Sequence, residues 1–588
     1  MRYGIIGNCK TAALVHESGS IDWLCFPKFD SPSVFAALLD PDGGHFAIHP
    51  TTPGSIHQTY LPGTNILQTE FDDGQNAFCL IDFMPRYREG DAYKKPLEIV
   101  RLLKPLRGNP SVRVSFEPRM NYARGETAIK LRKGLITASS ELESLYLYSC
   151  LDMNKIVSKE PIPLQKEVFL LLSYHEKLSD PTWSYANDLF QKTKSYWETW
   201  ASHCHLPPLY PEAVLRSALA LKLLTYEDSG AILAAATTSL PEIIGEQRNW
   251  DYRYCWLRDA SLMLEALKSI GHFEEARGFI HFLLKIFENR RTKIQIVYGI
   301  GGRTSLEETL LPHLKGYKNS GPVRIGNAAC QMQQNDIFGE VLNTIYLYYF
   351  HYQIEPMPEE VWSMVKFLVN TSAKEWRTPD AGIWEFRHRK EHFTFSKVLA
   401  WVALDRGIQI AKKTGKHYAV ENWTPIAREI HADIVAKGWV KSIHAYSQIY
   451  GSKNLDASLL MMHRYGFIKA TDPRWIATVN RCQEMLVQNG FVFRYTNPDD
   501  FGKPKSAFIV AGLWLAKALL SIGKREEARE LFDKTLSHAN HLGLFSEDFD
   551  VDTGELLGNF PQAYSHMAII NTAMALNQEV PPSPPPFK

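Results

Sequence analysis

The spacing of apolar residues changes near residue 183, and that change limits the kinds of fold open to this chain. Before it, short apolar runs such as SIDWLCF, NAFCLIDFMP and EVFLLLSY are separated by Gly, Pro, Asn and Asp. Many short strands with turn residues at such intervals are typical of an antiparallel β-sandwich. After it, most long segments repeat their apolar residues at helical spacing. We therefore predict a multidomain β + α protein in which residues 1–182 form an N-terminal antiparallel β-sandwich.

The part after the change is long enough for several layers of helices. Residues 183–209 contain one amphipathic segment followed by HLPPLYPEA, which indicates a helical linker. Residues 210–576 then provide about 30 residues for each of about twelve helix-and-loop units, which suits helices of roughly 10–15 residues with long loops. This arithmetic permits an (α/α)6 barrel, although no strict repeat is visible. The Pro-rich tail, residues 577–588, is expected to be extended or disordered.

Charge and composition exclude several kinds of partner. The 588 residues carry 65 Lys and Arg against 64 Asp and Glu, with no long basic run, so neither nucleic acid nor an anionic membrane is an expected partner. No apolar stretch reaches the roughly 18 residues of a membrane-spanning helix, and the N-terminus lacks a signal-peptide core. The eight cysteines are scattered without a C-x-x-C pair. Reduced thiols in a cytoplasmic protein are therefore expected.

Two loops of the helical part combine aromatic and charged residues. In NWDYRYCWLRDASLML, Arg258 and Asp259 precede an apolar helix, which Asp259 could simply cap. Alternatively, the pair grips polar atoms of a ligand, with Tyr252 or Trp256 as a wall of the site. In KNSGPVRIGNAACQMQQNDIFGEVL, Arg324 either forms a salt bridge that holds two loops together or contacts a substrate. Spacing alone leaves these alternatives open.

Two further loops each place a glutamate in an aromatic-rich stretch. AGIWEFRHRK carries Glu385 between Trp384 and Phe386. The two rings could be core residues, with Glu385 facing water or pairing with a nearby arginine. GLFSEDFDVDTGELLGNF carries Glu547. An EF-hand is excluded there, because loop positions 6 and 12 counted from Asp548 hold Thr and Asn instead of Gly and Glu. DVDTG is expected to be a turn.

Two glutamates in separate loops of one helical domain suggest cleavage of a glycosidic bond. That reaction needs an acid to protonate the leaving oxygen and, in the inverting mode, a carboxylate to deprotonate a water on the opposite face. An acid beside apolar rings tends to keep its proton near neutral pH, because burial disfavours the charge. Glu385 beside Trp384 suits this part. Glu547 could stay ionised if it accepts hydrogen bonds, but spacing does not show that the two glutamates face each other.

These stretches resemble glycoside hydrolase family 15, the group of glucoamylases, glucodextranases and prokaryotic trehalases. The similarity extends over nearly the whole chain. It includes the opening IGNCKTAALVHESGSIDWLCFPKFDSPSVFAALLD and then, in the family's order, the blocks YRYCWLRDASLML, GPVRIGNAA, DAGIWEFR and FSEDFDVDTGELLGNFPQAYSHMAIINTA. Several ordered blocks of this kind are highly specific.

The resemblance implies an N-terminal β-sandwich, a helical linker and an (α/α)6 barrel with an active site at one mouth. It implies inverting hydrolysis that releases β-glucose from the non-reducing ends of soluble α-glucans. By motif, Glu385 is implied to be the general acid and Glu547 the general base. The residues implied to bind the α-glucoside are Tyr252, Trp256, Arg258, Asp259, Arg324 and Trp384.

The blocks also depart from the family's pattern. Phe386 occupies the position of a second acid in the fungal glucoamylases, and KSAF (505–508) stands where relatives commonly have EGAF. The second difference leaves the local loop structure and the subsite preference open. No starch-binding module follows the barrel segment, so soluble oligosaccharides are expected rather than granular starch.

Several activities remain compatible with these residues. A glucoamylase-like exo-hydrolase is the first expectation, and an α,α-trehalase using the same two glutamates is the alternative. A sugar phosphorylase would not need the second glutamate, and a non-catalytic sugar-binding protein would need neither. The hydrolytic chemistry requires no metal and no organic cofactor. The oligomeric state cannot be read from the sequence.

Overall fold

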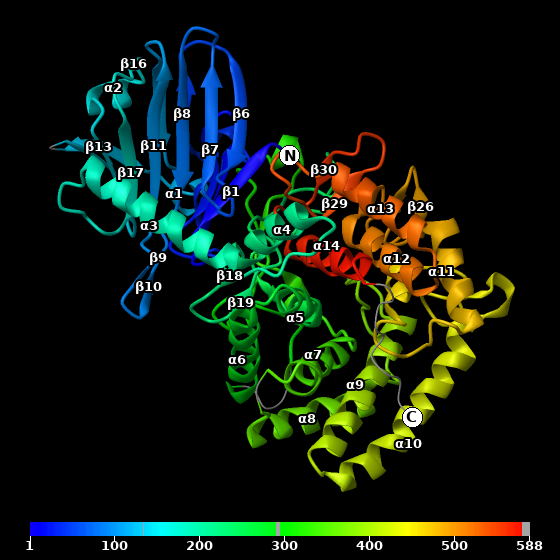
Figure 1. The fold of residues 1–588 in the computed structure, drawn as a ribbon. Helices are drawn as coiled ribbons and strands as arrows, with labels where there is room; N and C mark the ends of the chain where they lie inside the picture. The colour runs from blue at the N-terminus through cyan, green and yellow to red at the C-terminus, as the bar shows by residue number, and fades with distance from the viewer. Residues whose placement is uncertain (133, 290–293, 355, 579–588) are drawn as a thin grey trace.

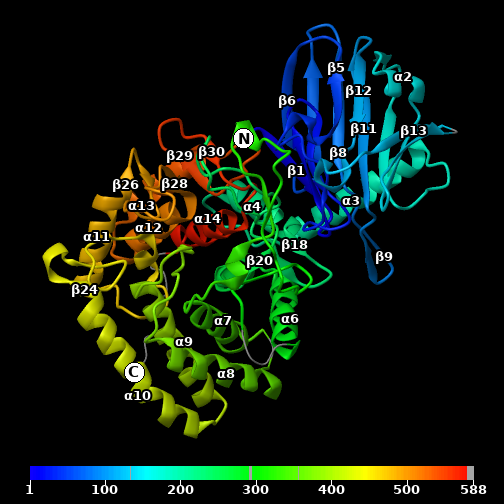
Figure 2. The same ribbon diagram turned by 180° about the vertical axis from the view of Figure 1, so that it is seen from behind.

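The computed structural model describes residues 1–132, 134–289, 294–354 and 356–578. A β-rich part, blue to cyan in Figure 1, is followed by a helical part, green to red. Figure 2 shows the same arrangement from behind. The predicted class, an antiparallel β-sandwich followed by a helical barrel, is confirmed. Most of the predicted tail, residues 579–588, lies outside the described residues.

Within the described residues, the N-terminal part contains two large antiparallel sheets. The seven-stranded sheet consists of β1 (Tyr3–Gly7), β2 (Ala12–His16), β3 (Ser20–Cys25), β4 (Ser33–Phe35), β5 (His45–Pro50), β12 (Ser111–Glu117) and β16 (Ile162–Pro163). The eight-stranded sheet consists of β6 (Ser55–Tyr60), β7 (Leu67–Asp72), β8 (Ala77–Phe83), β11 (Glu98–Arg107), β13 (Ala128–Arg132), β14 (Leu135–Ser139), β15 (Ser144–Ser149) and β17 (Val168–Tyr174). This part also contains a small hairpin, β9 (Tyr87–Glu89) and β10 (Ala92–Lys94), the 3-10 helix η1 (Pro41–Gly43), and two short α-helices, α1 (Met120–Ala123) and α2 (Met153–Ser158).

The burial of individual strands shows which faces are covered. Along β7 buried and half-buried residues alternate, as in a strand with one face on the core. In β8 and β17 every residue is buried. There α3 (Trp183–Ser202) covers the second face, with the Phe190 ring 5.8 Å from that of Phe83. This long helix, which lies in the predicted linker, thus packs on the sandwich and runs from it toward the helical part in Figure 1.

In the part of the chain that the structure describes, the helical part is a closed ring of six hairpins. Its inner elements are α5 (Ala260–Ser269), α7 (Ile337–Tyr346), α9 (Thr394–Lys413), the 3-10 helix η7 (Ala457–Met461), α12 (Ile509–Ser521) and α14 (Ala563–Leu576). Each packs on the next, and α14 returns to α5. The outer helices are α4 (Pro211–Leu223), α6 (Phe273–Asn289), α8 (Glu359–Glu375), α10 (His417–Gly438), α11 (Pro473–Leu486) and α13 (Arg525–Ser537). The inner helices α9, α12 and α14 are buried on nearly all sides, as enclosed helices must be.

All the long connections of this ring lie at one end. Each one leads from an outer helix to the next inner element, so it reaches the N-terminal end of that inner element. Among the described residues, the six long loops are 224–259, 294–336, 376–393, 439–456, 487–508 and 538–562, whereas the return connections are shorter. All the predicted site residues are on these six loops. The topology therefore gathers segments that lie far apart in the sequence at one mouth of the barrel.

Short strand pairs stiffen the loops. They are β18 (Thr225–Tyr226) with β19 (Ala231–Ile232), β20 (Cys255–Trp256) with β21 (Val297–Tyr298), β22 (Thr309–Leu310) with β23 (Arg324–Ile325), β24 (Trp439–Val440) with β25 (Ala445–Tyr446), and β26 (Val487–Gln488) with β27 (Phe491–Val492). The KSAF stretch forms β28 (Ser506–Phe508), which pairs with β29 (Asp548–Asp550), and β29 pairs with β30 (Leu556–Leu557). The predicted DVDTG turn is present, with Asp550 Oδ1 accepting hydrogen bonds from the backbone amides of Asp552 and Thr553.

The sandwich contacts the first long loop directly. Arg253 is fully buried and donates to the Ser31 carbonyl at 2.8 Å and to the Tyr122 hydroxyl at 2.9 Å, both in the N-terminal part. Its charge is balanced within its own loop by Asp251 at 2.7 Å. Trp23 adds a hydrogen bond of 2.9 Å from Nε1 to the Ala236 carbonyl. The loop is therefore held from the side of the sandwich.

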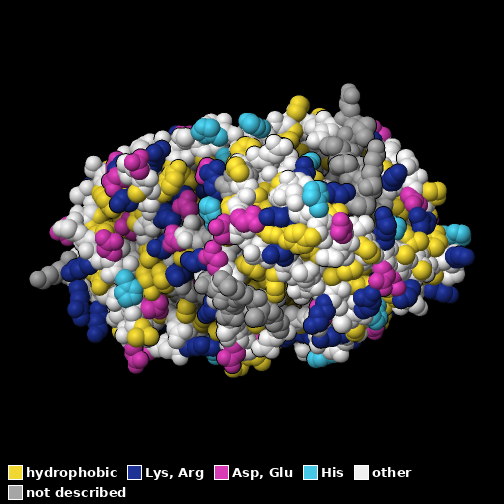
Figure 3. Space-filling model, turned by 90° about the horizontal axis from the view of Figure 1, so that it is seen from below, with side chains coloured by type: hydrophobic (Ala, Val, Ile, Leu, Met, Phe, Trp, Pro, Cys, Tyr) yellow, Lys and Arg dark blue, Asp and Glu magenta, His cyan; other side chains and the backbone are white. Residues whose placement is uncertain are grey.

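The surface shown in Figure 3 carries both signs of charge. Basic and acidic side chains are interspersed over this face, with hydrophobic side chains between them. This agrees with the nearly neutral net charge of +1. Among the described residues, no helix is both long and apolar enough to cross a membrane.

Candidate active site

A cavity at the loop end of the barrel collects side chains from five of the six long loops. Seven of the eight predicted site residues line it, together with charged and aromatic residues that were not predicted. The lining includes Glu242, Arg248, Trp250, Tyr252, Trp256, Arg258, Asp259, Trp384, Glu385, Arg387, Arg494, Asp499, Asp500, Phe501, Trp514, Glu547 and Tyr564. Arg324 is absent from the lining of this cavity, as far as the described residues define it.

Glu385 lies in a turn with an unusual backbone conformation. Its φ is +59°, in the left-handed region that favours glycine, and its amide donates to the Gly382 carbonyl at 3.1 Å. The neighbours on both sides are anchored. Phe386 is buried and stacks on Phe393 with ring centroids 5.4 Å apart, and Trp384 Nε1 donates to Asp456 at 2.5 Å. This fixed frame holds the strained residue at the cavity, as is common at functional sites.

The side chain of Glu385 meets polar groups rather than the apolar wall that was expected. Trp256 Nε1 donates to Glu385 Oε1 at 2.9 Å, and Arg258 lies 3.3 Å from the same oxygen. Arg258 is held in turn by the Ile383 carbonyl at 2.9 Å. The ring of Trp384 packs instead against Tyr495, Phe508 and Trp514. The two aromatic residues beside Glu385 in sequence therefore build the frame, and the contacts to its carboxylate come from another loop.

Asp259 lies next to Arg258 at the start of α5. The Asp259 side chain makes no capping hydrogen bond to that helix, so the capping alternative does not describe it. Burial raises the pKa of Asp259 to about 7, an effect that the neighbouring Arg258 opposes. Asp259 Oδ1 has no hydrogen-bond partner among the described residues. A buried acceptor at a cavity wall is available to a ligand hydroxyl.

Glu547 lies just before β29, in the last long loop. Tyr252 donates its hydroxyl hydrogen to Glu547 Oε1 at 2.8 Å. The Tyr252 and Trp256 rings are 5.3 Å apart, and Trp256 reaches Glu385 as described above. The two glutamates are thus joined through two aromatic side chains of the first loop. On its other side Glu547 is closely packed by Gly558, where an added Cβ would lie 2.7 Å from the Glu547 Cβ.

Comparison with known proteins identifies the family to which this chain belongs. The family model described as glycosyl hydrolases family 15 matches residues 208–574. The chain belongs to glycosyl hydrolase family 15. A second model, described as trehalase-like, N-terminal, matches residues 1–158 of this family 15 member. The protein is therefore a glycoside hydrolase, as its resemblance to the family implied.

The similarity to named relatives extends over nearly the whole chain of this family 15 enzyme. A protein of Mycolicibacterium smegmatis named trehalase is 36% identical over 97% of the chain and 90% of its own length. A trehalase of Thermoplasma volcanium is 35% identical over 98% of the chain and 93% of its own length. Among solved structures, a bacterial glucoamylase complexed with acarbose superposes with a TM-score of 0.71 at 14% identity, covering 98% of this chain and 93% of that one. The last similarity shows the fold.

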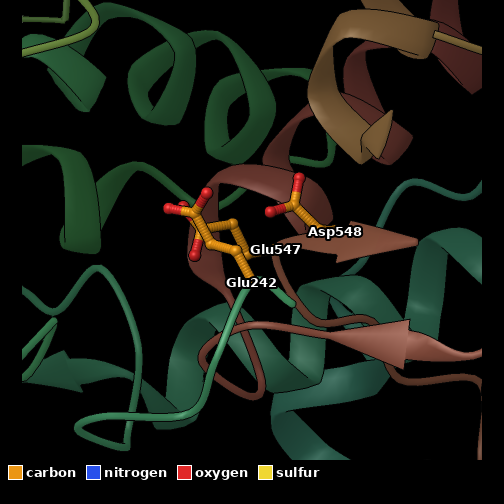
Figure 4. Close-up of side chains that lie close together, drawn as sticks. All are labelled: Glu242, Glu547 and Asp548. Atoms are coloured by element: carbon orange, nitrogen blue, oxygen red, sulfur yellow. The ribbon is translucent and has the colours of Figure 1, made fainter. Parts of the chain in front are cut away.

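Two acids next to Glu547 in this family 15 enzyme change its expected environment. Figure 4 shows Glu242, Glu547 and Asp548 with their carboxyl groups close together, and an oxygen of each lies within 4.8 Å of the others. Burial, together with Glu242 and Asp548, raises the pKa of Glu547 well above its usual range, although Arg494 opposes this. Burial also raises the pKa of Asp548 to about 8, again against Arg494. The hydrogen bond from Tyr252 lowers the pKa of Glu547, as the sequence led us to expect of such a bond, but burial and the two neighbouring acids act in the opposite direction.

Three clustered carboxylates are also the kind of group that binds a metal ion. Here a guanidinium already supplies positive charge, because an Arg494 nitrogen lies 2.9 Å from both Glu242 and Asp548. A metal ion at this position would have to displace Arg494. Neither Glu242 nor Arg494 was predicted. The one signal for Glu242 was an acid shortly before the aromatic block in PEIIGEQRNW, which did not stand out from other loop acids.

Arg324 lies behind the cavity wall. Its guanidinium lies 4.5 Å from the Trp250 ring centroid and donates to the Gln247 and Asn249 carbonyls, each at 2.9 Å. It also pairs with Glu308 at 3.3 Å. Arg324 thus ties its own loop to the first loop through hydrogen bonds to carbonyl oxygens, whereas its ion pair with Glu308 lies within its own loop.

Proposed function

We propose that this family 15 enzyme is an α,α-trehalase that hydrolyses trehalose to two glucose molecules with inversion of configuration. The observation that carries the proposal is its similarity, over nearly the whole chain, to relatives named trehalase. The trehalase-like N-terminal match supports it further. These findings favour the trehalase alternative over the glucoamylase-like expectation, because the glucoamylase likeness is one of fold at 14% identity.

The proposed reaction uses the two glutamates of the cavity. Glu385 gives its proton to the oxygen that leaves with one glucose, while the C1–O bond breaks. A water attacks C1 from the opposite face, and Glu547 takes the proton that this water loses. The products are one β-glucose and one glucose that carries the former glycosidic oxygen as a hydroxyl. Both carboxyls return to their starting state when a proton passes from Glu547 to Glu385 through solvent.

The remaining cavity residues support binding of the glucose that is attacked. We propose that Arg258 and Asp259 bind its hydroxyls, since both are half-buried polar groups at the cavity wall. Tyr252, Trp256 and Trp384 would line the same subsite. Trp256 and Arg258 also contact Glu385, so they orient the proposed acid toward the bond that breaks. Arg324 would act through Trp250, as a positioning residue.

The separation of the two carboxyl groups is a further expectation. An inverting mechanism requires about 6.5–9.5 Å between them, enough for the attacking water, whereas retention requires about 5 Å. A crystal structure would measure this separation. A value near 5 Å would contradict the inverting proposal.

The deciding experiment offers trehalose, maltose, isomaltose and maltotriose to the purified protein and follows product anomers by NMR. The trehalase proposal predicts that trehalose is the preferred substrate and that β-glucose appears before mutarotation. Glucose release from maltotriose but not from trehalose would refute it in favour of a glucoamylase. Phosphate-dependent formation of glucose 1-phosphate would instead identify a phosphorylase.

A further inference from the structure

Glu242 has no part in the mechanism proposed above, yet it is buried beside the proposed base. This residue is only 2% exposed and comes from the first long loop, whereas Glu547 comes from the last. Arg494, from the fifth loop, bonds Glu242 and Asp548 at 2.9 Å each. No hydrogen bond between Arg494 and Glu547 is found among the described residues. Three loops thus converge on Glu547, the proposed base. The guanidinium of Arg494 pairs with Glu242 and Asp548 instead.

The charges around Glu547 do not balance. The groups that face Glu547 are the Tyr252 hydroxyl, the Glu242 and Asp548 carboxyls and the Arg494 guanidinium. Three ionised carboxylates against one guanidinium would leave a net charge of −2 among largely buried groups. Like charges at this distance raise each other's affinity for a proton. The group therefore favours a state in which one proton is bound.

We propose that Glu242 is a positioning residue for the reaction, and that its carboxylate, fixed by Arg494, makes Glu547 a stronger base toward the attacking water. This inference rests on the proposed role of Glu547 as the general base. Base strength increases the rate of proton transfer as long as the base is ionised at the working pH. Arg494 acts in the opposite direction, because its positive charge lowers the affinity of the three carboxylates for protons. The pair would thus adjust the pH range in which Glu547 can accept a proton.

The test isolates the base from the acid. α-Glucosyl fluoride loses fluoride with little help from an acid, so its hydrolysis by a Glu385→Gln variant reports mainly the ionisation of the base. The rate of this variant is expected to rise with pH to a plateau. Adding Glu242→Gln keeps an oxygen for Arg494 but removes the charge, so the midpoint should move at least about one unit to lower pH and the plateau should fall. Adding Arg494→Gln should move the midpoint to higher pH.

The matched control is Glu246→Gln, four residues further along the same loop, where the glutamate pairs with Lys505 at the surface. It should leave the midpoint unchanged. A midpoint that is unchanged or higher in the Glu242→Gln variant would overturn the proposal, and thermal unfolding shows whether each variant is folded. If adding Glu547→Gln to the Glu385→Gln variant left the rate unaltered, Glu547 would not be the base. That result would remove the proposed function itself, so the two failures are distinguishable.

Discussion

Replacing Gly558 with alanine should displace the proposed base without removing any functional group. The added Cβ would lie 2.7 Å from the Glu547 Cβ and 2.9 Å from its Oε2, whereas ordinary contact begins at 3.4 Å. Glu547 or the Gly558 backbone must therefore move by about 0.7 Å. Since misplacement of a reacting group by about 1 Å can cost 100-fold, we expect kcat on trehalose to fall about 10- to 100-fold. The left-handed φ of +76° at this position adds about 1–2 kcal/mol of strain.

The control for this prediction is Gly523→Ala. Gly523 is exposed, has a φ of +83° and would have nothing within 4 Å of an added Cβ. The Gly523→Ala substitution should therefore lower stability by a similar amount, about 1–2 kcal/mol from left-handed strain, and leave kcat unchanged. Steady-state kinetics and thermal unfolding of both variants are the assays. Equal kcat values for the two variants would show that the contact with Glu547 does not position it.

Three further predictions concern the acid, the base and stability in acid. Glu385→Gln and Glu547→Gln should each lower kcat on trehalose at least about 100-fold without a large change in thermal stability, and near-native kcat in either would refute that role. Trp256→Phe removes the 2.9 Å hydrogen bond to Glu385, so kcat should fall more than KM changes; an unaltered kcat would show that the bond does not orient the acid. Burial lowers the pKa of His566 to about 3 from 6.5, so the stability that depends on its neutral form is present above pH 6.5 and is lost as pH falls toward 3. Thermal unfolding from pH 7 to 4 should therefore show a smaller loss in His566→Gln than in the native protein, and parallel curves would contradict this.

The fold and most of the cavity could be predicted because their signals are local. The change of apolar spacing near residue 183 separates strands from helices, and each block with a candidate residue lies before an apolar helix. Seven of eight predicted residues consequently line one cavity. The ring itself was harder to see, since η7 has five residues where a full inner helix was expected.

The electrostatics of the cavity could not be predicted, because they arise from side chains of different loops. Glu385 receives its polar contacts from Trp256 and Arg258, over 120 positions away in sequence. Glu547 is affected by Glu242 and Arg494, which approach only when three loops converge. Likewise, the position of Arg324 behind Trp250 depends on how two loops meet. Flanking residues reveal a turn or a core position, but not the charges that fold onto it.

Tyr252 and Arg253 are adjacent in the chain, yet one side chain points to the cavity and the other contacts the sandwich. Tyr252 bonds the proposed base, and Arg253 is bound by carbonyl and hydroxyl groups of the sandwich. A cut in the linker near residue 205, which looks like a natural boundary, would leave Arg253 and Asp251 without those partners, and the tyrosine one peptide bond away would lose its support. The sandwich would therefore support the proposed active site mechanically. A chimera that joins this barrel to the sandwich of a relative should be active only if that sandwich offers Arg253 equivalent carbonyl and hydroxyl acceptors.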